Sequence, residues 1–104
     1  MSKRPYKQFF HGKNIPKSNY GQKPLRWIPG TYLDTYHSET GQFRSRRKYG
    51  SDGYAYKDMD TADMHRPYDH VHDFVDRKRA SVPRNPTKAE RREFTKAKRK
   101  RRFF

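Results

Sequence analysis

The stretch TYLDTYHSETGQFRSRRKYGSDGYAYKDMD, residues 31–60, decides the fold. Three runs rich in β-forming residues lie within it, at 31–37, 42–49 and 54–60. Polar turn segments that end in Gly41 and Gly53 separate the runs, and glycine suits the positive φ that such turns need. The stretch therefore predicts an antiparallel meander of three strands.

The middle run carries a row of cations. Arg44, Arg46 and Lys48 alternate along it, and residues two apart in a strand share one face of the sheet. Two interpretations stand side by side: solvated charge on an outer face, or a strip that binds phosphates.

The segment that follows, residues 49–76, is rich in acids and imidazoles. It holds three of the five histidines and seven of the eleven acidic residues. Pro67 interrupts any helix there, and residues 68–74 alternate so that His70 and His72 share one face. This alternation predicts a fourth, short strand.

Formal charge divides the chain into three parts. Residues 1–48 carry +9, residues 49–76 carry −5, and residues 77–104 carry +11. Residues 1–30 contain four prolines and show neither a helical nor a strand period. We expect an irregular basic arm at 1–30, a sheet domain with an Asp/His centre at 31–76, and a basic linker with a C-terminal helix at 77–104.

The helix is expected over residues 88–101. Thr87 and Glu90 have the spacing of a capping box, which favours a helix start at this point. Apolar positions are few in this segment: Ala89, Phe94 and Ala97. We therefore expect a frayed helix that becomes fully helical on nucleic acid. The predicted class is α+β, a small curved antiparallel sheet of three to four strands with an irregular N-terminal arm and one basic C-terminal helix.

The composition limits the function classes. A formal net charge of +15 favours a polyanionic partner, RNA or DNA, and of the two we expect RNA. The absence of cysteine excludes disulfides and thiolate metal sites. No apolar run has the length of a signal peptide core or a membrane span, so we expect a cytoplasmic monomer that does not contact a membrane.

The first interpretation of the central segment is acid–base catalysis on RNA. Two histidines act as base and acid on a 2′-hydroxyl and its leaving oxygen, with His70 and His72 as the pair and His65 in reserve. An arginine such as Arg66 or Arg77 stabilises the phosphate. This chemistry requires no cofactor.

Two other interpretations stay open. In one, the histidines join Asp58, Asp60 or Asp69 around a divalent metal that activates water. The ligands of such a metal site would be Asp58, Asp60, His70 and His72. In the other, the carboxylates pair with the basic arms and the histidines fill a polar sheet edge.

Short motifs within residues 31–76 resemble those of small toxin-type domains. They are a strand ending in an aromatic, a DG turn, a D-x-D strand and a closing H-x-H-[DN]-aromatic motif, here at Tyr49, 52–53, Asp58 to Asp60 and His70 to Phe74. Such domains occur at the C-termini of bacterial polymorphic toxins and beside phage head-morphogenesis genes. The resemblance implies a compact ribonuclease-like fold and functional roles for Asp58, Asp60, His70 and His72.

We therefore expect a nucleic-acid-binding protein that acts on RNA as a small, metal-independent, toxin-like ribonuclease. The alternative is a non-enzymatic RNA- or DNA-binding accessory or phage-encoded protein, either a ribonucleoprotein component or an inhibitor of a nucleic-acid-guided enzyme. An immunity protein or a ribonucleoprotein is the expected kind of protein partner. The cations expected to contact nucleic acid are Arg44, Arg46, Arg47, Lys48, Arg77, Lys78, Arg79, Arg91, Arg92, Lys96, Lys98, Arg99, Lys100, Arg101 and Arg102.

Overall fold

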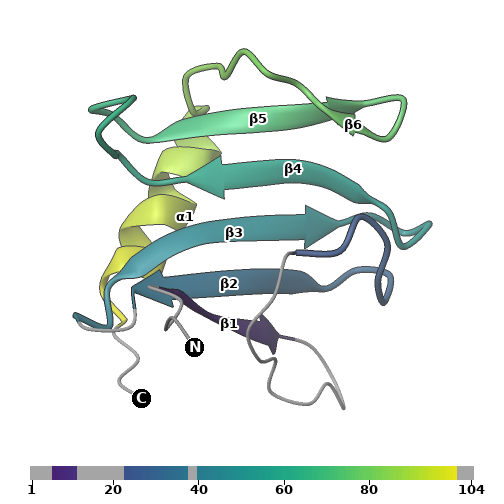
Figure 1. Ribbon diagram of the computed structural model, residues 1–104, viewed down its shortest axis with the longest axis horizontal. Coiled ribbons are helices and arrows are strands. Elements are labelled where there is room, and N and C mark those ends of the chain that lie inside the picture. Colours follow the sequence, from purple (N-terminus) through teal and green to yellow (C-terminus); the bar gives the residue numbers. More distant parts are fainter. Residues whose placement is uncertain (1–5, 12–22, 38–39, 101–104) are drawn as a thin grey trace, which may run out of the picture.

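The computed structural model describes residues 6–11, 23–37 and 40–100, with the backbone alone for the first of these ranges. The fold is α+β: an open antiparallel sheet with one C-terminal helix (Figure 1). The strands are β1 Tyr6–His11, β2 Tyr32–His37, β3 Phe43–Tyr49, β4 Ala55–Asp60, β5 His70–Val75 and the two-residue β6 Lys78–Arg79. Each strand pairs with its neighbours in the chain, so the strand order is β1 to β6.

The four predicted strands are present as β2 to β5, but the expected strand number is too low. β1 lies in the arm that was expected to be irregular and pairs with β2. Pairing of an edge strand uses backbone hydrogen bonds and does not require an alternating sequence. β6 follows a turn in which Asp76 and Arg77 have φ values of 51° and 62°. Neither residue is the glycine usual in such turns, so the sequence did not indicate a hairpin at this point.

The helix α1, Lys88–Lys98, packs across one face of the sheet and lies behind it in Figure 1. Phe94 and Ala97 are 2% and 5% exposed. They join a core cluster with one residue from each of the four central strands: Tyr36, Phe43, Met59 and Val71. The expectation of a helix without a sufficient apolar face is therefore wrong, because two well-placed apolar residues are enough when the sheet supplies the rest of the core.

The start of α1 agrees with the sequence, and its end is earlier than expected. The Thr87 hydroxyl accepts from the Glu90 amide, and the Glu90 carboxylate accepts from the Thr87 amide. Both halves of the capping box are thus present. Arg99 caps the C-terminus, two residues before the predicted end, and residues 101–104 lie outside the described ranges.

The cation row of β3 lies under α1. Arg46 and Lys48 pair with Glu93 of the helix at 2.8 and 3.1 Å. Lys57 of β4 likewise pairs with Glu90 at 2.7 Å. Carboxylates on the inner side of α1 thus cover Arg46 and Lys48, so these two are neither on an outer solvated face nor on an open strip, whereas Arg44 pairs with Asp63 of the β4–β5 connector.

The opposite side of the sheet, here called the open face, has a smaller apolar cluster. Leu33, Tyr49 and Ala55 are buried there, with Phe74 packed against them. Residues 23–30, here called the strap, run beside this cluster: the Tyr49 hydroxyl donates to the Pro24 carbonyl at 2.7 Å. The strap is irregular, as expected, apart from an isolated bridge between Arg26 and Tyr54. Within the described part of the chain, no helix has the length and apolarity to cross a membrane.

Candidate active site on the open face

Strand register brings the polar residues of the open face into two rows. Ser45 of β3 lies opposite Asp60 of β4, which lies opposite His70 of β5. The next row is Arg47, Asp58 and His72. Directly paired residues of antiparallel strands point to the same face, so these six side chains form one polar surface.

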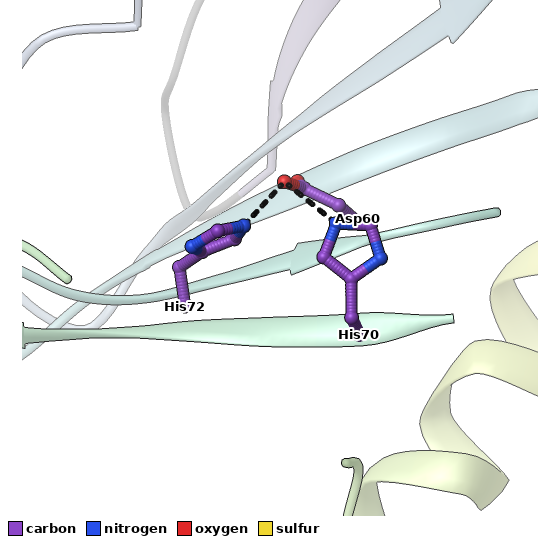
Figure 2. A group of neighbouring side chains, drawn as sticks. All are labelled: Asp60, His70 and His72. Atoms are coloured by element: carbon purple, nitrogen blue, oxygen red, sulfur yellow. Dashed lines mark ion pairs between the residues drawn. The ribbon is translucent and has the colours of Figure 1, made fainter. Parts of the chain in front are cut away.

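Asp60, His70 and His72 form the centre of this surface (Figure 2). The Nε2 atoms of both rings lie 3.8 Å from Oδ2 of Asp60. The two rings are 5.2 Å apart between centroids and nearly perpendicular, at 77°. Both histidines are buried, at 2% and 5% exposure, whereas the Asp60 side chain is 18% exposed.

Backbone carbonyls fix the orientation of both rings. Nδ1 of His70 lies 2.9 Å from the Tyr68 carbonyl, and Nδ1 of His72 lies 2.7 Å from the Ala80 carbonyl. A carbonyl oxygen only accepts, so each Nδ1 carries the hydrogen. In the neutral ring the lone pair is then on Nε2, the atom that faces Asp60. The arrangement places two proton-accepting nitrogens beside one carboxylate.

Arg79 of β6 links the two acidic residues. It donates from Nη2 to Asp60 at 2.8 Å and from Nε to Asp58 at 2.9 Å. Arg47 holds Asp58 through two further hydrogen bonds, at 2.8 and 2.9 Å. Burial alone would raise the pKa of Asp58, but the hydrogen bonds from the two arginines and the charge of Lys23 outweigh it and lower the pKa. Asp58 is therefore an ionised anchor for the two arginines.

Lys23 enters the site from the strap. Its Nζ donates to the Ser45 hydroxyl, and the Lys23 carbonyl accepts from Arg47 at 2.8 Å. Burial lowers the pKa of Lys23, with the charges of Asp58 and Asp60 opposing that effect. Sequence reasoning missed this residue, because the strap has no period that would place a lysine over the D-x-D strand.

The other residues proposed as catalytic lie apart from this group. His65 is exposed in the connector between β4 and β5, and its amide donates to Asp63. Arg66 donates its amide to the same carboxylate. Arg77, at the β5–β6 turn, stacks on the ring of Tyr54 with 3.7 Å between its Cζ and the ring centroid. The arginine that the structure brings to the histidines is Arg79.

Asp58 and Asp69, two of the suggested metal ligands, are engaged by cations. Asp58 is held by two arginines, and Asp69 accepts from Lys98 of α1. Among the residues that the structure describes, the group of donor atoms that lie within 4.8 Å of one another comes from Asp60, His70 and His72.

The predicted nucleic-acid contacts fall into two groups. Arg44, Arg46, Arg47, Lys48 and Lys98 form ion pairs within the fold, and Arg79 belongs to the polar site. The outer side of α1 exposes the second group around a shallow hollow: Arg91, Arg92, Lys96 and Arg99, with Lys88, which was not among the predicted contacts, lining the same hollow. Lys100 is also exposed, as are Arg77 and Lys78 of the β5–β6 hairpin, and Arg101 and Arg102 lie outside the described residues. The exposed cations of α1 are on the opposite side of the sheet from the histidines.

No protein-family model, curated protein or solved structure matches the chain.

Proposed function

We propose that this protein binds RNA and cleaves it at the Asp60–His70–His72 group, as a small ribonuclease of the toxin-like kind that its motifs resemble. One observation carries the proposal: two carbonyl-oriented histidines direct Nε2 toward the same carboxylate oxygen, 3.8 Å from each. Arg79 donates to that carboxylate, and the Lys23 ammonium donates to Ser45, the residue paired with Asp60 in the sheet. This set provides a base, an acid and positive charge for a phosphate.

The reaction follows from these roles. One histidine, neutral at Nε2, takes the proton of the 2′-hydroxyl, and the 2′-oxygen attacks the adjacent phosphorus. The second, protonated at Nε2, gives its proton to the departing 5′-oxygen. The bond to that oxygen breaks and leaves a 2′,3′-cyclic phosphate and a 5′-hydroxyl. Asp60, beside both rings, stabilises whichever ring holds the proton.

Arg79 has the position suited to the phosphate. Its side chain is 39% exposed, far more than the two rings, so it is the member of the group that an incoming anion meets first. It also bridges two carboxylates, Asp58 and Asp60. A phosphate that draws Arg79 away from Asp60 would release that carboxylate beside the histidines, while Arg47 keeps Asp58 paired.

The test uses tag-free protein and a fluorescent single-stranded RNA, with and without chelator. We expect cleavage in both conditions, products that end in a cyclic phosphate, and no cleavage where the 2′-hydroxyl is replaced by hydrogen. The double variant His70→Gln/His72→Gln should lose cleavage and keep RNA affinity. His65→Gln, an exposed histidine outside the group, is the matched control. Unchanged cleavage by the double variant would contradict the proposal.

A second candidate is a non-enzymatic nucleic-acid-binding protein. The observation that favours it is the burial of both histidines together with the exposed cations on the far side of the sheet. In that case the open face serves stability, and α1 carries the binding. A protein that binds RNA through α1 and shows no histidine-dependent cleavage would establish this candidate.

A further inference from the structure

We propose that Asp60, His70 and His72 also form a binding site for a divalent transition-metal ion such as Zn²⁺, and that the bound ion blocks cleavage. The binding half of this proposal stands independently of any activity. The inhibitory half rests on the proposed acid–base function of the same histidines.

The donor atoms are already close to the arrangement that a metal ion needs. The Nε2 atoms and the carboxylate oxygen lie within 4.8 Å of one another, and both nitrogen–oxygen distances are 3.8 Å. Bonds of about 2.0–2.1 Å to a tetrahedral ion place donors about 3.3 Å apart. Small rotations of the three side chains therefore bring the atoms into the first coordination shell, and a fourth position remains for water.

The groups that orient the two imidazole rings for metal binding are also present. A histidine that binds a metal through one nitrogen usually donates its other N–H to a carbonyl or carboxylate, which fixes the tautomer. Both rings here donate Nδ1–H to backbone carbonyls, of Tyr68 and Ala80. The nitrogens left for an ion are the two that face Asp60. Because backbone atoms set this orientation, the site does not depend on a flexible partner.

The donor chemistry selects the class of ion. Two imidazole nitrogens and one carboxylate suit Zn²⁺ and its neighbours in the first transition row, whereas Mg²⁺ and Ca²⁺ prefer sets made of oxygen. Lone pairs that hold a metal cannot accept a proton. A bound ion therefore removes both the base and the acid from the reaction proposed above.

Arg79 competes with the ion for Asp60. It donates to Oδ2 of Asp60, the oxygen nearest both nitrogens, and a cation at the site must share or replace that bond. Arg79 retains Asp58 as a partner when it releases Asp60. Removing this guanidinium should thus strengthen metal binding, whereas a purely structural disturbance of the site would weaken it.

The experiment measures metal binding directly. Co²⁺ is titrated into tag-free protein, its visible absorption reports coordination geometry, and Zn²⁺ then displaces it. We expect one ion per chain with the intense bands of a tetrahedral complex. Asp60→Asn, His70→Gln and His72→Gln should each weaken Zn²⁺ at least about tenfold. His65→Gln should bind as the unaltered protein does, and Arg79→Gln should bind more tightly.

A spectrum of the unaltered protein keeps the test valid if a variant fails to fold. Imidazole ¹⁵N resonances recorded with and without Zn²⁺ should show changes at Nε2 of two histidines and little change at their Nδ1. Octahedral-type weak bands, or changes in other histidines alone, would overturn the site.

Cleavage assays separate the two halves. Zn²⁺ at saturation should abolish RNA cleavage, and chelator should restore it. If Zn²⁺ binds and no cleavage occurs in any condition, the site stands and the ribonuclease function fails. If cleavage occurs and Zn²⁺ does not bind, the ribonuclease function stands and the metal site fails. Cleavage that requires Zn²⁺ would overturn both the inhibitory role and the acid–base mechanism, since the ion would then activate water.

Discussion

Arg46 joins the sheet to the helix: its Nη1 atom donates to Glu93 of α1 at 2.8 Å. The same guanidinium donates two hydrogen bonds to Asp34 of β2, at 2.7 and 2.9 Å. The Asp34 side chain is 1% exposed, and that of Glu93 is 25% exposed. Arg46 thus compensates one deeply buried carboxylate and one partly exposed carboxylate. Removing Arg46 and removing Glu93 should therefore destabilise the protein to different extents.

Arg46→Gln should destabilise the protein far more than Glu93→Gln. The first change removes the guanidinium charge and both of its hydrogen bonds from the buried Asp34 carboxylate, at a cost of about 3–5 kcal/mol. The second removes a partly exposed partner, at a cost of about 1 kcal/mol. Urea denaturation of the two single variants measures both. Equal losses would show that Arg46 does not compensate Asp34.

The helix should form without nucleic acid. Phe94 is 2% exposed in the core cluster, so Phe94→Ala is expected to cost about 3–5 kcal/mol. Thr87→Ala removes the cap and should cost about 1 kcal/mol. Circular dichroism of the free protein, with the exposed Thr95→Ala as a control on the same helix, checks both effects. Helical signal that appears only after RNA is added would contradict the observed packing.

Stability should fall in acid through Glu90. Hydrogen bonds from Arg84 and Lys57 and from the Thr87 amide hold the pKa of Glu90 well below its ordinary value of 4.5. A carboxylate with a lowered folded pKa stabilises the fold above its unfolded pKa, and this contribution is lost as the pH falls from about 4.5 toward the folded pKa. Thermal unfolding measured at pH 6 and pH 3 should show a smaller pH effect for Glu90→Gln than for the unaltered protein.

Long and short RNA substrates should respond differently to the outer side of α1. The triple variant Arg92→Gln/Lys96→Gln/Arg99→Gln should weaken binding of a long RNA and reduce its salt slope by about 2, since each lost phosphate contact contributes about 0.7 on single strands. Cleavage of a dinucleotide should be unchanged, because α1 packs on the side of the sheet opposite the open face that carries the histidines. Loss of dinucleotide cleavage would place α1 in the reaction itself.

The sequence predicted the elements whose signal is local. Alternation placed His70 and His72 on one face, glycine positions marked the turns, and the capping box located the start of the helix. The sequence did not predict which face of the sheet the helix covers. Arg46 looked like a surface cation because alternation reveals the side of a strand, whereas only the position of Glu93 shows which side the helix covers.

The composition of the candidate site was predictable only in part. Asp60, His70 and His72 share a motif region, and strand pairing brings them together. Lys23 and Arg79 come from segments without a helical or strand period, the strap and a two-residue strand. Their places depend on hydrogen bonds to Ser45 and Asp58, long-range contacts that no local pattern encodes.

The strand order also has a kinetic meaning. Every strand pairs only with strands next to it in the chain, and from β2 to β6 the connections are short, so this part of the sheet can grow hairpin by hairpin. The hairpins within residues 55–80 already contain Asp60, both histidines, their carbonyl partners at Tyr68 and Ala80, and Arg79. Asp60, His70, His72 and Arg79 therefore belong to one contiguous segment, and this group can assemble on the nascent chain before α1 packs on the other side of the sheet.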